Sequence, residues 1–149
     1  MHKNNFVKGT FFLLLFLVMG CATHPYLISE SYLPVSEHRK VAVAVIGPAR
    51  MVSQNGREIT SHYHDRNFKY IDDMTKTKVR YYTKVAVLGP RRPYEISVEV
   101  FKEQKDPDTK QFVDQGLDEG LSQKRLTEVA KVLNQSRENP QSIDVENPF

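Results

Sequence analysis

Two neighbouring segments carry the clearest structural pattern in this chain: KVRYYTKVAVL (78–88) and YEISVEVFK (94–102). Apolar and polar residues alternate along both of them, which is the pattern of strands with one buried and one solvated face. A short link rich in proline and arginine joins the two segments, so they predict an antiparallel hairpin. The charges expected to oppose each other across this hairpin are Arg80 and Lys84 on the first strand and Glu95 and Glu99 on the second.

A second hairpin is expected earlier in the chain. The run VAVAVI (41–46) is apolar on both faces, which indicates a strand covered on both sides. Gly47-Pro48 interrupts it, and Asn55-Gly56 is a strong signal for a hairpin turn. The return strand is then EITSHYH (58–64). The residues expected on one face of this return strand are Ile59, Ser61 and Tyr63.

A single helix is predicted near the C-terminal end, from Gln123 to Gln135. Ser122 has the character of an N-cap, and an apolar stripe follows it with helical spacing. The segment 104–120 before this helix is expected to be a loop. The predicted fold class is therefore α+β, with a mainly antiparallel four-stranded sheet of two hairpins packed by one C-terminal helix. The residues of the apolar stripe are Leu126, Val129, Ala130 and Leu133.

Two similar octapeptides lie 42 residues apart: VAVIGPAR (43–50) and VAVLGPRR (85–92). One interpretation is a duplicated unit of two strands, which would place the Gly-Pro bends at equivalent ends of the sheet. The other is that two buried strands ending in turns have converged on similar residues. The flanking residues do not align without gaps, which favours convergence.

The N-terminal segment has the layout of a secretory signal peptide. Lys3 and Lys8 give it a positive start, and the run FFLLLFLVM (11–19) is apolar without interruption. Nine apolar residues are too few to cross a bilayer as a helix, which takes roughly 20. A cleaved export signal is therefore expected rather than a permanent transmembrane helix.

The end of this segment, Val18-Met19-Gly20-Cys21, resembles the lipobox of bacterial lipoproteins. The resemblance implies cleavage after Gly20, a diacylglyceryl group on the Cys21 sulfur and an acyl chain on the new amino group. Each buried CH₂ contributes about 0.8 kcal/mol, so three chains hold the protein firmly to a membrane. Ala22 follows the cysteine where an aspartate would favour the inner membrane. By resemblance, this favours the outer membrane, facing the periplasm, in a cell that has two membranes.

Composition limits the organisation of the remaining chain. Loss of Lys3 and Lys8 lowers the formal net charge from +3 to +1, so bulk charge gives no reason to expect nucleic-acid binding. Cys21 is the only cysteine, so no intrachain disulfide can form. The length suits one domain. The expected divisions are a signal peptide (1–20), a lipidated tether (21–39), a single α+β domain (40–136) and a flexible tail (137–149).

His62 and His64 are the candidate metal ligands. Side chains two residues apart on a strand project to the same side, and two imidazoles can hold Zn²⁺ when a third ligand is near. Two alternatives remain open, a solvated strand face and a pH-responsive pair of histidines. The residues that could supply a third ligand are His38, Asp72 and Asp73.

A second candidate site is a patch of basic and aromatic residues around the hairpin turn. Such a surface suits anionic lipid headgroups, a cell-wall polymer or an acidic patch on another protein. The alternative is an ordinary solvated strand face beside a turn. The residues of this patch are Arg80, Tyr82, Lys84, Arg91 and Arg92.

No catalytic motif is present: the chain lacks G-x-S-x-G, a P-loop and a dinucleotide fingerprint. We therefore expect a membrane-anchored envelope lipoprotein that acts as a binding or assembly component and is not an enzyme. It needs no cofactor beyond the acyl groups on Cys21, and its expected partners are the membrane and an envelope protein. The alternative is a periplasmic ligand or metal binder using His62 and His64. A cell-wall enzyme ranks third.

Overall fold

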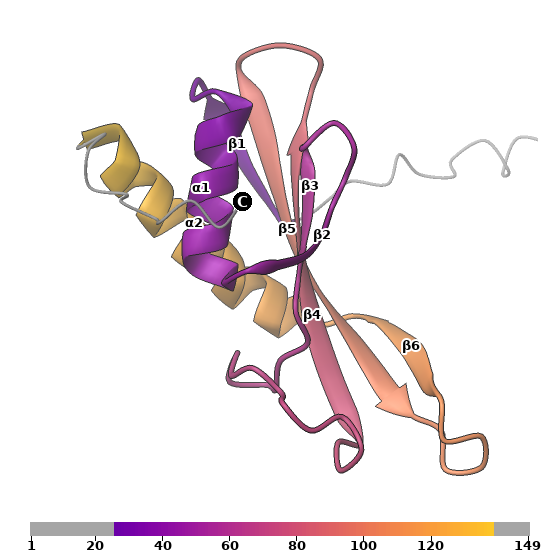
Figure 1. Ribbon diagram of the computed structural model, residues 1–149. Helices are drawn as coiled ribbons and strands as arrows, with labels where there is room; N and C mark the ends of the chain where they lie inside the picture. The colour runs from indigo at the N-terminus through magenta and orange to yellow at the C-terminus, as the bar shows by residue number, and fades with distance from the viewer. Residues whose placement is uncertain (1–25, 139–149) are drawn as a thin grey trace, which may run out of the picture.

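The computed structural model describes residues 26–138, which form one antiparallel sheet and two helices (Figure 1). The predicted class, α+β with an antiparallel sheet and a C-terminal helix, is confirmed. In chain order the elements are β1 (Leu27–Ser31), α1 (Val35–Ile46), β2 (Ala49–Val52), β3 (Glu58–Ser61), β4 (Val79–Leu88), β5 (Tyr94–Lys105), β6 (Phe112–Leu117) and α2 (Glu119–Glu138).

The sheet has six strands rather than the predicted four. Its order is β1-β5-β4-β3-β2, and β6 also pairs with β5. The first part of β5 pairs with β1 and the second part with β6, because β5 is 12 residues long and each partner is short. The predicted loop at 104–120 was therefore wrong in part, since it contains the end of β5, the whole of β6 and the start of α2.

The central hairpin of β4 and β5 is confirmed. Its register places Leu88 opposite Glu95 and continues without a break to the far end of β4. Lys84 faces Glu99 and Arg80 faces Glu103, so the register is offset by four residues from the one that would oppose Lys84 to Glu95 and Arg80 to Glu99. The turn that joins the strands fixes this register, so Arg80 lies too far from the turn to reach Glu95 or Glu99.

The predicted strand at 41–46 was wrong, because VAVAVI is the second half of helix α1. The helix begins after Pro34, and the side chains that face the core recur with the spacing of one helical stripe. This stripe begins at a buried histidine, outside the apolar run, which is why the run alone read as a strand. The stripe consists of His38, Val41, Ala42 and Val45.

Gly47-Pro48 is therefore the end of a helix and not a break in a strand. Gly47 has φ +77° and donates its N–H to the Val43 carbonyl, as a C-terminal capping glycine does. The repeated octapeptides thus differ in structure: residues 43–46 are helical, whereas residues 85–88 belong to β4. This difference supports convergence over a duplicated pair of strands.

Part of the segment assigned to the tether is folded. Leu27–Ser31 forms β1 against β5, and α1 begins at Val35, so the predicted boundary at residue 40 falls inside a helix. Residues 1–25 and 139–149 lie outside the described part of the chain. The signal peptide, Cys21 and most of the predicted tail are among them.

Helix α2 begins four residues before the predicted start. Asp118 supplies the cap, since its Oδ1 accepts the Leu121 N–H at 3.0 Å. Ser122, the predicted N-cap, lies inside the helix and is fully buried. Its Oγ donates to the Asp118 carbonyl and accepts the Val100 N–H, both within 2.9 Å, so it links α2 to β5.

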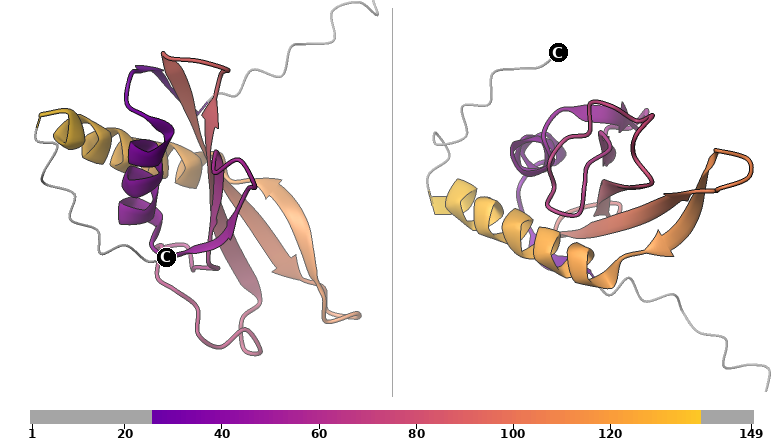
Figure 2. Two further views of the ribbon diagram at one scale, coloured as in Figure 1. Left: turned by 45° about the horizontal axis from the view of Figure 1, so that its top comes forward. Right: turned by 90° about the horizontal axis from the view of Figure 1, so that it is seen from below.

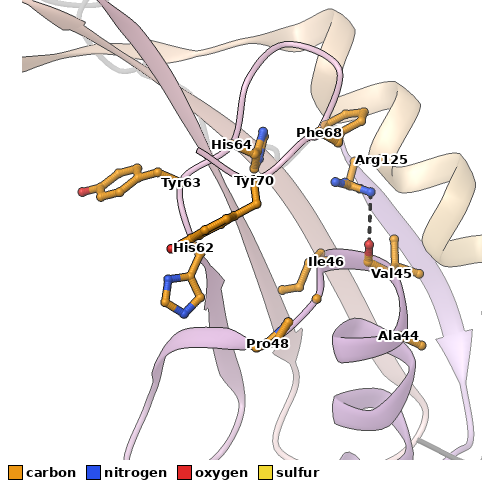
Figure 3. Close-up of a pocket in the computed structure, with 11 residues that line it drawn as sticks. Ala44, Val45, Ile46, Pro48, His62, Tyr63, His64, Phe68, Tyr70 and Arg125 are labelled. Atoms are coloured by element: carbon orange, nitrogen blue, oxygen red, sulfur yellow. Dashed lines mark hydrogen bonds between the residues drawn. The ribbon is translucent and has the colours of Figure 1, made fainter. Parts of the chain in front are cut away.

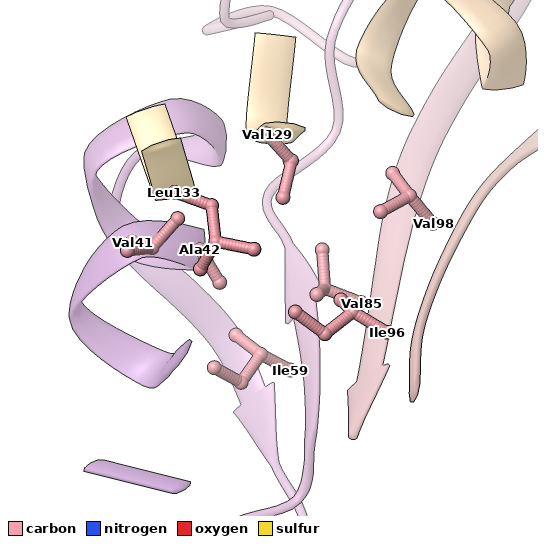
Figure 4. Packing of buried hydrophobic residues seen from close by; sticks show 8 residues of the cluster. All are labelled: Val41, Ala42, Ile59, Val85, Ile96, Val98, Val129 and Leu133. Atoms are coloured by element: carbon pink, nitrogen blue, oxygen red, sulfur yellow. The ribbon is translucent and has the colours of Figure 1, made fainter. Parts of the chain in front are cut away.

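Both helices lie on one face of the sheet, and the hydrophobic core fills the space between them and the strands (Figures 2 and 4). Three residues of the predicted stripe of α2 reach the core, since Val129 and Leu133 are each 1% exposed and Leu126 packs against them, whereas Ala130 is only half-buried. No helix in the described residues is long and apolar enough to span a membrane. The buried residues of the main cluster are Val41, Ala42, Ile59, Val85, Ile96, Val98, Val129 and Leu133.

Candidate functional site

A bulge after β3 separates the side chains that strict alternation would put on one face. Thr60 pairs with Lys84, and His64 forms a bridge with Tyr81. The segment from Thr60 to His64 therefore advances four residues while β4 advances three, from Lys84 to Tyr81. The segment after β3 thus holds one extra residue. Ser61 and His64 are buried beside Thr83, whereas the Tyr63 ring meets that of Tyr82, whose side chain projects from the opposite face of β4. The predicted common face of Ile59, Ser61 and Tyr63 was therefore wrong at Tyr63.

His64 is a buried and fully hydrogen-bonded residue, 4% exposed. Its Nδ1 lies 2.8 Å from the Asp65 carbonyl, so this nitrogen carries the proton and donates. Its Nε2 then accepts from the Thr83 hydroxyl at 3.1 Å. Burial lowers the pKa of His64, and the nearby Arg125 lowers it further. The imidazole is held neutral, with neither ring nitrogen free for a metal.

The predicted third ligands do not assemble with this pair. His62 is exposed, and its ring contacts Tyr70 edge to face at 5.7 Å. His38 belongs to α1 and hydrogen-bonds Ser31 Oγ at 2.6 Å. Within residues 26–138 no group of three metal-ligating side chains could hold an ion. The metal hypothesis therefore stays a prediction without support from the geometry.

The sheet face opposite the helices carries a ladder of arginines and aromatic rings. The Arg80 guanidinium lies between two rings, 3.7 Å from the centre of Tyr63 and 3.8 Å from that of Phe112. Its Nη2 also lies 2.5 Å from the Glu103 carboxylate, with 16% of each side chain exposed. Cation–π contacts and a partly buried ion pair therefore fix Arg80 in one position.

Arg50 extends this ladder toward the sheet edge. Its guanidinium lies 4.4 Å from the Tyr63 ring centre, and the Tyr82 ring stacks on Phe101 at 5.2 Å. Among residues 26–138 both helices lie on the other face of the sheet, as the ribbon in Figure 2 shows. We call this surface the open face. It consists of Arg50, Tyr63, Arg80, Tyr82, Phe101 and Phe112.

The structure divides the predicted basic patch. Arg80, Tyr82 and Lys84 share one face of β4, and Lys84 pairs with Glu58 at 3.2 Å. Arg91 and Arg92 belong to the turn beyond Leu88, which is roughly 26 Å along the strand from Arg80 at about 3.3 Å per residue. Sequence reasoning missed four residues of the open face, because they lie on β2, after β3, on the second half of β5 and on β6. These residues are Arg50, Tyr63, Phe101 and Phe112.

A pocket of about 550 Å³ lies between the C-terminal end of α1, the β3 bulge and α2 (Figure 3). Arg125 of α2 forms part of its wall. The Arg125 Nη1 donates to the Val45 carbonyl at 3.2 Å and to Glu128 at 2.7 Å. The Phe68 ring lies 3.6 Å from the guanidinium carbon. Sequence reasoning missed this site, since Arg125 had no distinguishing pattern around it.

The chain matches no protein-family model, and no curated protein or solved structure was found to be similar to it.

Proposed function

We propose that this chain is a membrane-anchored envelope lipoprotein whose domain binds a protein partner through the open face. The observation that supports this most directly is the ladder of arginines and rings on a sheet face without a helical cover. An uncovered sheet face in a small domain is usually polar. Two arginines and four aromatic residues in contact on such a face therefore indicate a binding surface.

The composition of the open face favours a protein as the occupant. Arginine, tyrosine and phenylalanine are enriched in protein interfaces and in their energetic hot spots. Arg80 and its two rings are held by their own contacts, so little side-chain freedom is lost on binding. Arg50 is exposed, and no carboxylate in the described part of the chain pairs with it. The partner is therefore expected to present an acidic residue to Arg50.

Site-specific crosslinking in intact envelopes tests this proposal. A photo-crosslinking amino acid at Met51, which is 60% exposed and adjacent to Arg50, should give one discrete product. Charge reversal by Arg50→Glu should remove this product. The same amino acid at Lys131, on the exposed side of α2, is the matched control and should not give it. Equal products from both positions, or a product insensitive to Arg50→Glu, would contradict the proposal.

The lipid anchor leads to a separate prediction. Cys21→Ser should move the protein from the membrane fraction to the soluble fraction, because the thioether that carries the acyl chains cannot form. Fractionation of the envelope followed by immunoblotting measures this. The control is the double variant Cys21→Ser/Ser53→Cys, which has a thiol elsewhere in the chain. This thiol should not restore membrane association. Full retention of Cys21→Ser in the membrane fraction would refute the anchor.

A further inference from the structure

Strand β6 lies at an edge of the sheet, and its outer side has no neighbouring strand. It pairs with β5 alone, and the β5–β6 hairpin extends away from the two helices (Figures 1 and 2). No loop or side chain among residues 26–138 forms a hydrogen bond with the main chain of Phe112 or Asp114. The outer side of β6 is therefore open to another strand.

The ladder between β5 and β6 shows which main-chain groups point outward. The Asp106 N–H donates to the Gln111 carbonyl at 2.8 Å, and in an antiparallel pair such bonds recur at every second residue. Val113 is therefore bonded to the residue opposite it on β5, whereas Phe112 and Asp114 are not. The N–H and C=O groups of Phe112 and Asp114 thus point toward the free edge.

This edge is more regular than the other edges of the sheet. Proteins commonly protect edge strands with bulges and charges. Strand β2 has a register shift at Arg50, which is itself exposed, and β1 has one next to Glu30, where φ is +60°. In β6 the register shift comes only after Asp114, so residues 112–114 form a regular stretch. Val113, at the centre of this stretch, is 47% exposed.

Charge complementarity favours a second copy of this chain as the occupant of the edge. Asp114 and Phe112 share one face of β6, and the Asp114 carboxylate accepts only the Gly116 N–H, at 2.7 Å. Two cations lie over the Phe112 ring, with the Arg80 guanidinium 3.8 Å and the Lys105 Nζ 5.6 Å from its centre. Antiparallel pairing of two β6 strands can place Asp114 of each copy beside the cations of the other.

Two-fold symmetry restricts the register of such a pairing. Outward-pointing residues must bond one another, so Phe112 faces either itself or Asp114 of the second copy, or Asp114 faces itself. Asp114 against Asp114 would oppose like charges. Phe112 against Phe112 would place Asp114 opposite Lys110, which lies in the turn before β6 with φ +60°. Phe112 against Asp114 pairs the whole regular stretch and brings Val113 opposite Val113.

We infer that two copies of this chain associate through antiparallel pairing of their β6 edges, with Val113 opposite Val113 of the second copy and Phe112 opposite Asp114. The pairing uses the main chain of Phe112, whereas the open face uses its ring. The inference therefore does not rest on the protein partner proposed for the open face. In the dimer the two sheets form one sheet, with both open faces on the same side.

Sedimentation equilibrium of the mature chain with Cys21→Ser tests the association. We expect a reversible dimer, and Val113→Lys should raise the dissociation constant at least tenfold, because the pairing brings the two lysines face to face. Met51→Lys is the matched control, since Met51 is 60% exposed on the other edge strand, and it should leave the dissociation constant unchanged. A chain that stays monomeric up to about 1 mM, or an equal effect of Met51→Lys, would overturn the inference.

Disulfide crosslinking tests the register. In the Cys21→Ser chain, Val113→Cys supplies the only thiol. Opposed residues of a non-bonded pair have Cα atoms about 4.5 Å apart, which a disulfide can span, so mild oxidation should give a covalent dimer. The two Asp114 residues are diagonal neighbours about 7–8 Å apart, so Asp114→Cys should crosslink at least tenfold more slowly.

A third variant separates this contact from the open face. Arg50→Glu, added to the Val113→Cys chain, should leave the rate of crosslinking unchanged, although it should abolish the crosslink to the proposed partner. Crosslinking of Asp114→Cys as fast as that of Val113→Cys, or loss of the covalent dimer in Arg50→Glu, would contradict pairing through β6.

Discussion

Replacing Leu133 by alanine should lower the free energy of unfolding by about 3 kcal/mol. Leu133 is 1% exposed and packs in the cluster that joins α2 to α1 and the sheet (Figure 4). Truncation removes buried methyl groups and leaves a cavity, because α1 and the strands constrain one another and cannot collapse into the space. The free energy of unfolding of a small domain is roughly 5–15 kcal/mol, so this one change removes a large share of the stability.

Urea unfolding of the mature chain with Cys21→Ser measures this change as a shift of the midpoint. With a slope of about 1.5 kcal/mol per molar urea, 3 kcal/mol corresponds to a shift of roughly 2 M. Lys131→Ala is the matched control on the exposed side of the same helix, and it should alter stability by less than about 0.5 kcal/mol. A loss below 1 kcal/mol for Leu133→Ala would show that α2 does not pack as described.

The central hairpin and the stripe of α2 could be predicted because both patterns are local. Each strand of the hairpin alternates along its own length, and Leu133 follows Val129 and Leu126 at helical spacing. The register was not predictable from alternation, because a shift of four residues, which places Lys84 opposite Glu99 instead of Glu95, leaves every side chain on the same face. Strands β1 and β6 were missed because each is short and depends on the length of β5 for its pairing.

Helix α1 shows where local pattern fails. VAVI at 43–46 forms the end of a helix and VAVL at 85–88 forms a strand, although the residues are nearly identical. The preceding residues differ: SEHRK (36–40) carries a polar helical turn, whereas VRYYTK (79–84) already alternates as a strand. An apolar run of this length does not distinguish a buried strand from a buried helix, so the neighbouring residues and their tertiary contacts decide.

The candidate sites were predictable only in part, because they combine residues from separate elements. Arg80 and Tyr82 were found on one strand, but their ring partners come from the β3 bulge and from β6. A bulge cannot be read from alternation, since it is the point at which alternation breaks. Arg125 required the position of α2 relative to α1, which no pattern within the helix specifies.

Acidification from pH 7.5 to 5 should destabilise the domain through His38 and His64. Both are buried, and burial lowers the pKa of each below its usual 6.5. His38 bonds Ser31 Oγ and leaves Nδ1 unpartnered, and the charges that act on it are Arg92, Arg137 and Glu37. The charges that act on His64 are Arg125 and Asp65.

The sign follows from proton binding. A histidine with a lowered pKa binds fewer protons in the folded state than in the unfolded state, so stability falls as protons are added. The contribution is complete above about pH 6.5 and declines from there down to the folded pKa values. Each histidine adds a slope of up to about 1.36 kcal/mol per pH unit, so the slope from the two together reaches at most about 2.7 kcal/mol per pH unit. Hydrogen bonds lower the pKa of Asp73 and Asp106 below 3.8. The contribution of these two carboxylates to stability is therefore lost only below the pH range in which the histidines titrate.

Urea midpoints measured at half-unit steps of pH should show this slope in the unaltered domain. The double variant His38→Gln/His64→Gln should flatten the curve between pH 6.5 and 5, because neither site then takes up a proton on unfolding. The exposed His62 offers the matched control, since His62→Gln removes an imidazole without removing a buried one. A slope that survives in the double variant, or one that His62→Gln abolishes, would assign the acid sensitivity to other groups and would contradict the neutral, buried state of both histidines.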